Sequence, residues 1–229
     1  MLTWTQRRQF TVFAVALIAA ILVLAGLFVY FFSGQADKVE VLEGADFSIL
    51  WARFFKLRDG FVDLSALVEN PNNLSAGKFK YSFKIYDSNN ILISVKEGES
   101  YARPGEKFVL FESNVAVFQR TPARVILDIE NIVWEKDSKK EFPVIDILGT
   151  ERFLEDIFPR LVLTLKNNGQ KTHESVEATV VLWTSEDETA GVSRTLISNF
   201  KIDEERSITF TWPEAISGVL KVEAFFRLK

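Results

Sequence analysis

The sequence predicts an all-β protein in which one transmembrane helix precedes two tandem antiparallel β-sandwiches. Residues 10–32 form an apolar run without a charge. Beyond residue 37, apolar and polar side chains alternate in short stretches separated by turn-forming residues, and part of this pattern is repeated 97 positions later. Hydrophobic residues make up 48% of the 229 residues, so the chain can form two cores, each in a module of roughly 100 residues.

The apolar run reads FTVFAVALIAAILVLAGLFVYFF from Phe10 to Phe32. A helix of this length extends roughly 35 Å at about 1.5 Å per residue, which exceeds the roughly 30 Å hydrocarbon layer of a bilayer. Trp4 lies before the run and Tyr30 near its end, where aromatic residues are expected at the two membrane interfaces. We therefore predict a transmembrane helix over residues 10–32 that anchors the chain in the lipid bilayer.

The charges beside the run predict its orientation. Arg7 and Arg8 lie in residues 1–9, which carry no acidic residue, whereas Asp37 and Lys38 balance each other on the far side. Positive charge favours the cytoplasmic side, so we expect a cytoplasmic tail over 1–9 in the cell membrane and an extracytoplasmic location for the rest. A cleaved signal peptide is the alternative, because 33–37 contains small residues, but the run exceeds the roughly 7 to 15 apolar residues of such peptides.

After a linker over residues 33–44, twelve short segments have the two-residue period of strands. In the first half they are 47–57, 61–69, 78–86, 91–98, 107–112 and 124–134; in the second half they are 144–148, 160–166, 175–184, 193–197, 206–212 and 218–227. Turn-forming pairs such as Asp59-Gly60 and Pro104-Gly105 separate them. Residues 151–160 are expected to form one helical turn or an irregular crossing.

The two halves superimpose when they are shifted by 97 positions. Leu64, Ala66, Val68 and Asn70 then meet Leu161, Leu163, Leu165 and Asn167. A later segment from Pro104 meets one from Glu204 after a three-residue adjustment. We predict two copies of one β-sandwich, a first module over residues 45–136 and a second over 144–229, with a charged joint at 137–143.

Three short motifs of the first module resemble those of a known group. They are Val68-Glu69-Asn70-Pro71-Asn72, Ile85-Tyr86-Asp87 and Pro104-Gly105-Glu106, and they resemble the FxLYD, CARDB-like and late-embryogenesis-abundant/WHy group of immunoglobulin-like β-sandwiches. The second module is similar through residues 165–169 but has Trp183-Thr184 and Glu204-Glu205-Arg206 at the other two positions. The resemblance implies immunoglobulin-like modules that are non-catalytic adhesion, spacer or interaction units outside the membrane.

The sequence nominates no catalytic residue, cofactor or metal site. A net charge of -4, from 27 basic and 31 acidic side chains, argues against nucleic-acid binding, and the chain has no Cys. The single histidine, His173, lies near Ser175, but no third group completes a catalytic arrangement, so we expect a solvated turn histidine. The acidic run 186–188 lacks the spacing of a calcium loop and is expected to be a hairpin tip.

Paired aromatic residues break the alternation at two places. Phe54-Phe55 and Phe225-Phe226 each put one ring on the face that a solvated sheet exposes to water. The neighbourhood of Pro122 also breaks the alternation. These four residues and the Pro122 neighbourhood are therefore candidates for the contact between modules or for a partner surface. The four tryptophans of the modules, Trp51, Trp134, Trp183 and Trp212, lie in or beside predicted strands and are expected to fill cores.

From these features we expect a non-catalytic, membrane-anchored extracytoplasmic protein that acts as an interaction or scaffold component of the cell envelope. Its partner would be an envelope protein of unknown identity. One alternative is a subunit of a secretion or pilus-type apparatus, in which the membrane helix itself contacts partners. Another is a carbohydrate-active enzyme that uses carboxylates between the modules.

Overall fold

The computed structural model describes residues 16–28, 42–136, 141–186 and 188–229. The chain divides into two compact units, Met1–Val41 and Leu42–Lys229. In the first unit a helix covers residues 16–28, and within the described ranges no helix has both the length and the apolar character needed to cross a membrane. Several predicted anchor residues lie outside the described residues: Trp4, Arg7, Arg8, Phe10, Tyr30 and Phe32.

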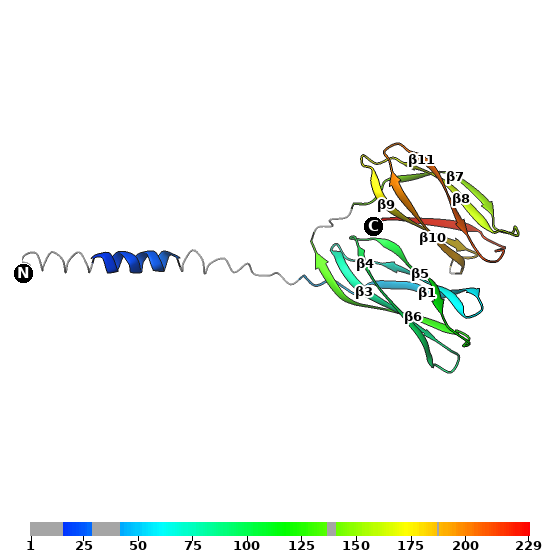
Figure 1. Ribbon diagram of the computed structural model, residues 1–229, viewed down its shortest axis with the longest axis horizontal. Coiled ribbons are helices and arrows are strands. Elements are labelled where there is room, and N and C mark those ends of the chain that lie inside the picture. Colours follow the sequence, from blue (N-terminus) through cyan, green and yellow to red (C-terminus); the bar gives the residue numbers. More distant parts are fainter. Residues whose placement is uncertain (1–15, 29–41, 137–140, 187) are drawn as a thin grey trace, which may run out of the picture. The chain divides into compact units, whose positions relative to one another are not determined.

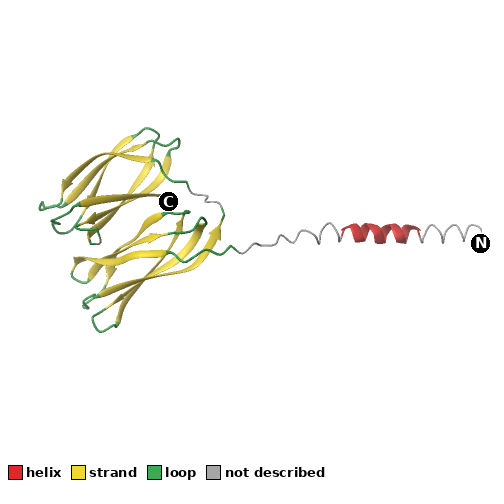
Figure 2. Cartoon of the chain, turned by 180° about the vertical axis from the view of Figure 1, so that it is seen from behind, coloured by secondary structure: helices red, strands yellow, loops and turns green. Residues whose placement is uncertain are grey.

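The second unit is built from strands joined by short loops (Figures 1 and 2). In the first module they are β1 (Ser48–Arg58), β2 (Phe61–Glu69), β3 (Ser75–Tyr86), β4 (Leu92–Ala102), β5 (Lys107–Ala116) and β6 (Arg124–Glu135). In the second they are β7 (Ile145–Phe153), β8 (Arg160–Asn167), β9 (His173–Trp183), β10 (Thr189–Phe200), β11 (Glu205–Thr211) and β12 (Lys221–Leu228). The prediction of a mostly β chain is therefore confirmed.

The segment 151–160 forms no helical turn. It contains the end of β7, an irregular loop over 154–159 and the start of β8, so the expected irregular crossing is limited to the loop. Glu151 and Arg152 continue the β7 ladder because they pair with Val162 and Leu161. The loop that follows leaves Ile157 91% and Phe158 79% exposed.

Both modules have the same strand topology. The first contains the antiparallel sheets β1-β2-β5 and β4-β3-β6, and the second contains β7-β8-β11 and β10-β9-β12. β7 to β12 thus occupy the same places in the second module as β1 to β6 do in the first. The repeat seen in the sequence is a repeat of structure, with two sandwich-like pairs of three-stranded sheets.

The strand pairing corrects the offset that we expected in the later part of the repeat. Ala66 pairs with Leu110 in the first module, and Leu163 pairs with Ile208 in the second. The offset between β5 and β11 is therefore 98 positions, one more than in β2 and β8, where three more were expected. The observed offset is 98 and the expected one was 100. Both are even numbers, so the same residues of β5 and β11 face inward in either alignment.

A buried asparagine closes the same end of each module. The Asn70 side-chain nitrogen donates to the carbonyl oxygens of Leu74 and Arg103, at 2.8 Å each. Asn167 makes the two equivalent bonds to Lys171 and Phe200, at 2.9 and 3.0 Å. Both asparagines are fully buried. The Asn-containing turns are therefore structural latches, because a buried amide must find partners inside the fold.

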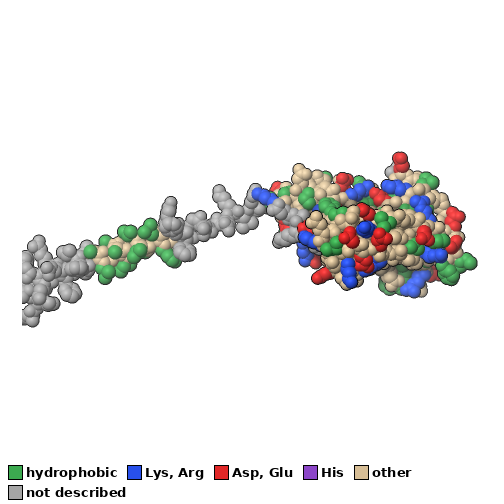
Figure 3. All heavy atoms as spheres, turned by 90° about the horizontal axis from the view of Figure 1, so that it is seen from above, with side chains coloured by type: hydrophobic (Ala, Val, Ile, Leu, Met, Phe, Trp, Pro, Cys, Tyr) green, Lys and Arg blue, Asp and Glu red, His purple; other side chains and the backbone are tan. Residues whose placement is uncertain are grey.

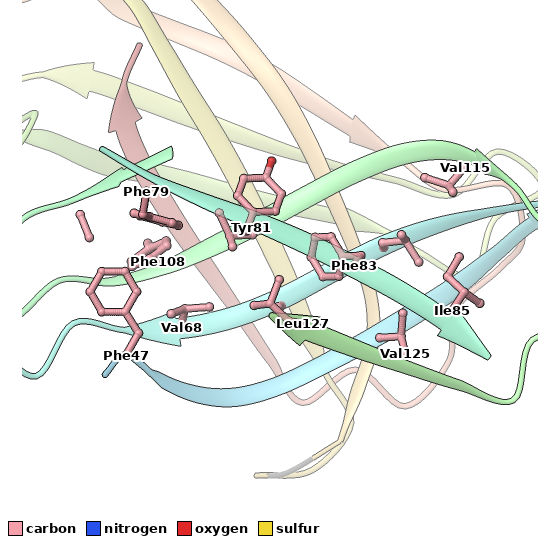
Figure 4. Close-up of a cluster of buried hydrophobic side chains, with 14 of the residues drawn as sticks. Phe47, Val68, Phe79, Tyr81, Phe83, Ile85, Phe108, Val115, Val125 and Leu127 are labelled. Atoms are coloured by element: carbon pink, nitrogen blue, oxygen red, sulfur yellow. The ribbon is translucent and has the colours of Figure 1, made fainter. Parts of the chain in front are cut away.

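Each module has its own hydrophobic core between its two sheets. In the first, the rings of Phe47, Phe79 and Phe108 meet edge to face or tilted, with centroids 5.1 to 6.1 Å apart (Figure 4). In the second core, smaller side chains such as Val176, Ala178 and Val180 replace the aromatic residues of β3. The two modules thus have the same strand arrangement but core side chains of different size.

A third hydrophobic cluster lies between the modules, and we call it the inter-module cluster. Its buried members are Leu67, Val109, Phe111, Val181, Trp183 and Val192, with Trp51, Phe55 and Phe225 partly buried against them. These residues come from the outer faces of sheets β1-β2-β5 and β10-β9-β12. The four sheets are therefore stacked as four layers around three cores, and the central strands β2 and β9 are covered on both faces.

Candidate functional site

The interface between the modules is the candidate functional site, because it brings together side chains from both copies. The four candidate phenylalanines lie at or next to it. Phe54 packs into the core of the first module and Phe226 into that of the second, whereas Phe55 and Phe225 join the inter-module cluster. Each pair thus places one ring on each face of its strand. The broken alternation marks strands that are packed on both sides.

The four tryptophans are divided in the same way. Trp134 packs against the first core and Trp212 against the second. Trp51 and Trp183 meet edge to face in the inter-module cluster, with ring centroids 6.1 Å apart. This geometry suits the charge distribution of aromatic rings and adds to the free energy gained from burying their area.

A buried ionic cluster lies next to these rings. Arg227 of β12 reaches into the first module, where its Nε lies 3.1 Å from Glu106 Oε1. Its other nitrogens donate to the Ser100 hydroxyl and the Tyr101 carbonyl oxygen. Its guanidinium lies 4.3 Å from the ring centroid of Tyr101 and 4.6 Å from that of Phe108. Charge, hydrogen bonds and ring stacking all hold this side chain of the second module in the first.

Glu106 is shared between two arginines. Arg103 Nη2 donates to Glu106 Oε1 at 2.5 Å, on the same oxygen that Arg227 contacts. Arg103 is 2% exposed and Glu106 3% exposed. Arg103 also donates to the Glu141 carbonyl oxygen and stacks 3.7 Å from the ring centroid of Phe142. The cluster therefore ties together the first module, the last strand and the segment that enters the second module.

An open cleft of about 430 Å³ runs beside this cluster. Residues of β3, β4 and β5 line one side, and Glu177, Arg194 and Arg227 line the other. Its charged groups are paired: Lys78 with Glu99 at 2.8 Å, and Arg194 and Lys229 with Glu177 at 3.3 and 2.9 Å. The cleft is a polar seam between the modules, and its charges are largely neutralised by one another.

Tyr81 lines the cleft on the side of the first module. Its ring belongs to the first core, and its hydroxyl points away from that core and donates to Glu112 at 2.7 Å (Figure 4). Burial and this acceptor raise the pKa of the Tyr81 hydroxyl well above its usual range. Gly98 lies opposite on β4, where any Cβ would overlap the Tyr81 hydroxyl. A tyrosine of this kind is a neutral hydrogen-bond donor rather than a base.

The residues considered for metal or acid–base chemistry form no site in the part of the chain that is described. No group of three or more His, Asp or Glu side chains there could hold a metal ion. His173 begins β9 and is partly buried, with its Nε2 shielded from solvent, so it differs from the solvated turn histidine that we expected. Of the acidic run, Glu186 is exposed at the tip that follows β9, and residue 187 lies outside the described residues.

Sequence reasoning missed the ionic cluster at this interface. Arg227 and Glu106 are 121 positions apart, so no local pattern links them. One signal was available in hindsight: Arg227 follows Phe225 on the outer face of β12, and a charge next to aromatic residues there indicates a partner across an interface.

Comparison with known proteins gives no relative to which this site can be matched. No protein-family model matches the chain, and no curated protein sequence matches it.

Proposed function

We propose that the protein is a non-catalytic, membrane-anchored interaction or scaffold protein of the cell envelope, whose two modules act as one rigid extracytoplasmic head. The inter-module cluster carries this proposal. Linked modules that bury tryptophan, phenylalanine and a bridged arginine between them are held in one orientation, whereas modules with small polar contacts move independently. A fixed pair of modules suits the presentation of a surface to a partner.

The strand arrangement supports an immunoglobulin-like assignment for both modules. Numbering the strands of one module from one to six, strands one, two and five form one sheet, and three and six pair in the other. Immunoglobulin domains also place their strands A, B and E in one sheet and C and F in the other. The fourth strand pairs with the third here, as the additional strand of variable-type domains does.

The charges of the cleft favour a non-catalytic function over a carbohydrate-active enzyme. A glycosidase needs one carboxyl group with a raised pKa to donate a proton. In the cleft the hydrogen bond from Lys78 instead lowers the pKa of Glu99, and Glu177 is paired with two cations. Acidic and basic side chains also intermingle on the face of the head seen in Figure 3, which fits a general interaction surface.

The anchor is proposed from the apolar run. The helix over 16–28 carries only apolar residues, and its large side chains are exposed; Leu17, Leu22 and Leu24, for example, are 63%, 67% and 66% exposed. Exposed apolar side chains all around a helix need an apolar environment. The uncharged sequence extends beyond the helix to residues 10 and 32, a length that fits a bilayer. Arg7 and Arg8 favour a cytoplasmic N-terminus.

Crosslinking of the full chain in intact cells, followed by capture from the membrane fraction, tests this proposal. Val181→Asp puts a charge into the inter-module cluster, where Val181 is fully buried, and should separate the modules. Val95→Asp makes the same change at a position that is 42% exposed and is the matched control. We expect the parent and Val95→Asp to capture one envelope protein that Val181→Asp loses. Recovery of that protein at equal yield with Val181→Asp, or of no partner with the parent, would contradict the proposal.

A further inference from the structure

An exposed phenylalanine occupies an unfavourable backbone conformation at the far end of the first module. Phe118, in the loop between β5 and β6, has φ of 55° and is 73% exposed. The loop is a tight turn, because Arg120 N donates to the Val117 carbonyl oxygen at 3.2 Å. Positive φ is usual for Gly, Asn or Asp and is rare for an aromatic residue, which pays a steric cost there.

Main-chain hydrogen bonds account for the turn at residue 118, but they do not require a phenylalanine there. Val117 N donates to the Gly60 carbonyl oxygen at 2.8 Å, and a Cβ on Gly60 would lie 3.1 Å from the Phe118 carbonyl oxygen. The main-chain hydrogen bonds of Val117 to Gly60 and to Arg120 fix the backbone at residue 118. A glycine at 118 would allow both of them without steric cost. The phenyl ring therefore adds strain and places apolar surface in water, and backbone strain of this kind concentrates at functional sites.

Phe118 forms part of the wall of an open pocket of about 330 Å³. The pocket lies between the β1–β2 turn and the β5–β6 loop, and Phe54, Phe61, Val62, Val117 and Pro122 provide further apolar lining. Three cations also line it, Lys56, Arg58 and Arg120, against a single acid, Asp59. The pocket thus combines an apolar surface with an excess of positive charge.

We propose that this pocket binds an acidic peptide segment of a partner protein, with an apolar side chain of the peptide packed against Phe118. The excess of cations around an apolar floor is complementary to an apolar residue flanked by carboxylates. The site does not depend on the proposed membrane anchor. Residues 42–47 lie at the end of the module that Asn70 closes, where Ala45 N donates to Asn72 Oδ1. β1 leads from that end to the β1–β2 turn, so the pocket lies at the opposite end of the module.

Two of the cations are exposed and can reach a ligand. Lys56 lies 3.7 Å from Asp59, and both side chains are largely or fully exposed. The Lys56 pair is a surface pair that contributes little free energy, so a carboxylate of a bound peptide can replace Asp59 at small cost. Arg120 lies 3.3 Å from Asp87, which is 15% exposed, but the Arg120 side chain itself is 52% exposed and can offer further donors to a ligand.

The test is the binding of a fluorescein-labelled EELFEE peptide to the full chain, measured by fluorescence anisotropy, with KKLFKK as the charge-reversed probe. Phe118→Gly should weaken EELFEE binding by about tenfold or more, since a central aromatic contact is lost. The same variant should unfold in urea at the parent's midpoint or a higher one, because glycine relieves the strain. Phe118→Asn, which also accepts positive φ, should behave in the same way.

Two further variants separate the site from the rest of the surface. Arg120→Gln should weaken EELFEE binding and reduce its dependence on salt concentration, because one ion contact is removed. Phe158→Ser changes an equally exposed phenylalanine of the second module and should leave binding unchanged.

Several results would overturn the proposal. These are no binding of EELFEE at millimolar concentration, equal binding of KKLFKK, unchanged binding by Phe118→Gly, or a lower unfolding midpoint for that variant, which would make the ring structural. Phe118-dependent binding to vesicles of anionic phosphatidylglycerol, without binding of EELFEE, would assign the pocket to a lipid surface instead. Loss of EELFEE binding does not bear on the anchor or on the rigid head, so the two proposals fail separately.

Discussion

Removing the Glu106 charge should destabilise the protein more than removing the charge of either arginine that it binds. Glu106→Gln keeps the shape of the side chain but leaves Arg103 and Arg227 together, 2% and 7% exposed, with no anion between them. Breaking a buried ion pair by removing one partner costs about 3 to 5 kcal/mol, because the remaining charge is uncompensated. Glu106→Gln should fall in this range or above it.

Arg227→Met gives the comparison. Glu106 then keeps Arg103 at 2.5 Å, so the buried carboxylate remains paired. The loss is mainly that of hydrogen bonds from a charged donor, about 1.5 to 3 kcal/mol, and the methionine still covers the Tyr101 and Phe108 rings. The double variant should cost less than the sum of the single variants by about 1 to 3 kcal/mol, as expected for groups in one network.

Urea unfolding of the full chain in mild detergent, followed by tryptophan fluorescence, measures these differences. Trp51 and Trp183 report directly on the interface, since their rings are in contact there. Lys84→Met is a control, because Lys84 and Asp128 form a partly exposed pair outside the interface, with each side chain 36% exposed. This variant should cost less than about 1 kcal/mol. Equal costs for Glu106→Gln and Arg227→Met, or additive costs in the double variant, would refute the shared carboxylate.

Three further predictions concern the first and second modules. Asn70→Ala and Asn167→Ala should each cost about 2 to 4 kcal/mol of unfolding free energy in urea, because each removes one buried and one partly buried hydrogen bond to a carbonyl oxygen; a cost for one alone would contradict the common latch. Gly98→Ala should destabilise the chain by about 1 to 3 kcal/mol through overlap with Cζ and the hydroxyl of Tyr81. Tyr81→Leu, which has neither atom, should make the further cost of Gly98→Ala smaller than it is in the parent, whereas Tyr81→Phe, which keeps Cζ, should not. The raised pKa of Tyr81 means that the folded state holds the phenolic proton more tightly than the unfolded state. The contribution of this proton to the unfolding free energy is complete below the usual tyrosine pKa of about 10 and is lost as pH rises above it. The fall in unfolding free energy at alkaline pH should therefore be smaller for Tyr81→Phe, and an unchanged fall would be contrary to this expectation.

The strands and the inward faces could be predicted because they depend on local alternation. Leu161, Leu163 and Leu165, for example, are all buried as their spacing predicts. The latch asparagines were visible as a repeated position in the sequence. Their role was not, since the acceptor carbonyl groups lie up to 33 residues away.

The stacking of the two modules could be predicted only in part. The sequence VVLW at 180–183 and the two Phe-Phe pairs indicate strands that are apolar on both faces, but they do not identify which sheet covers them. The conformation of Phe118 was also not predictable, because the turn around it is held by a main-chain bond from Val117 to Gly60, far away in the sequence. Long-range partners, rather than local pattern, decide both features.

The rate at which buried cysteines react tests the rigid two-module head most directly. The chain has no native Cys, so Val109→Cys and Val181→Cys each place a single thiol in the inter-module cluster, where the parent side chains are 2% and 0% exposed. Val95→Cys, at a position that is 42% exposed, gives the rate of an open thiol. We expect maleimide to label the two cluster thiols at least about a hundredfold more slowly than the control in the folded full chain. Labelling of all three at similar rates would show that the faces of the two modules are open to solvent and would contradict the single head.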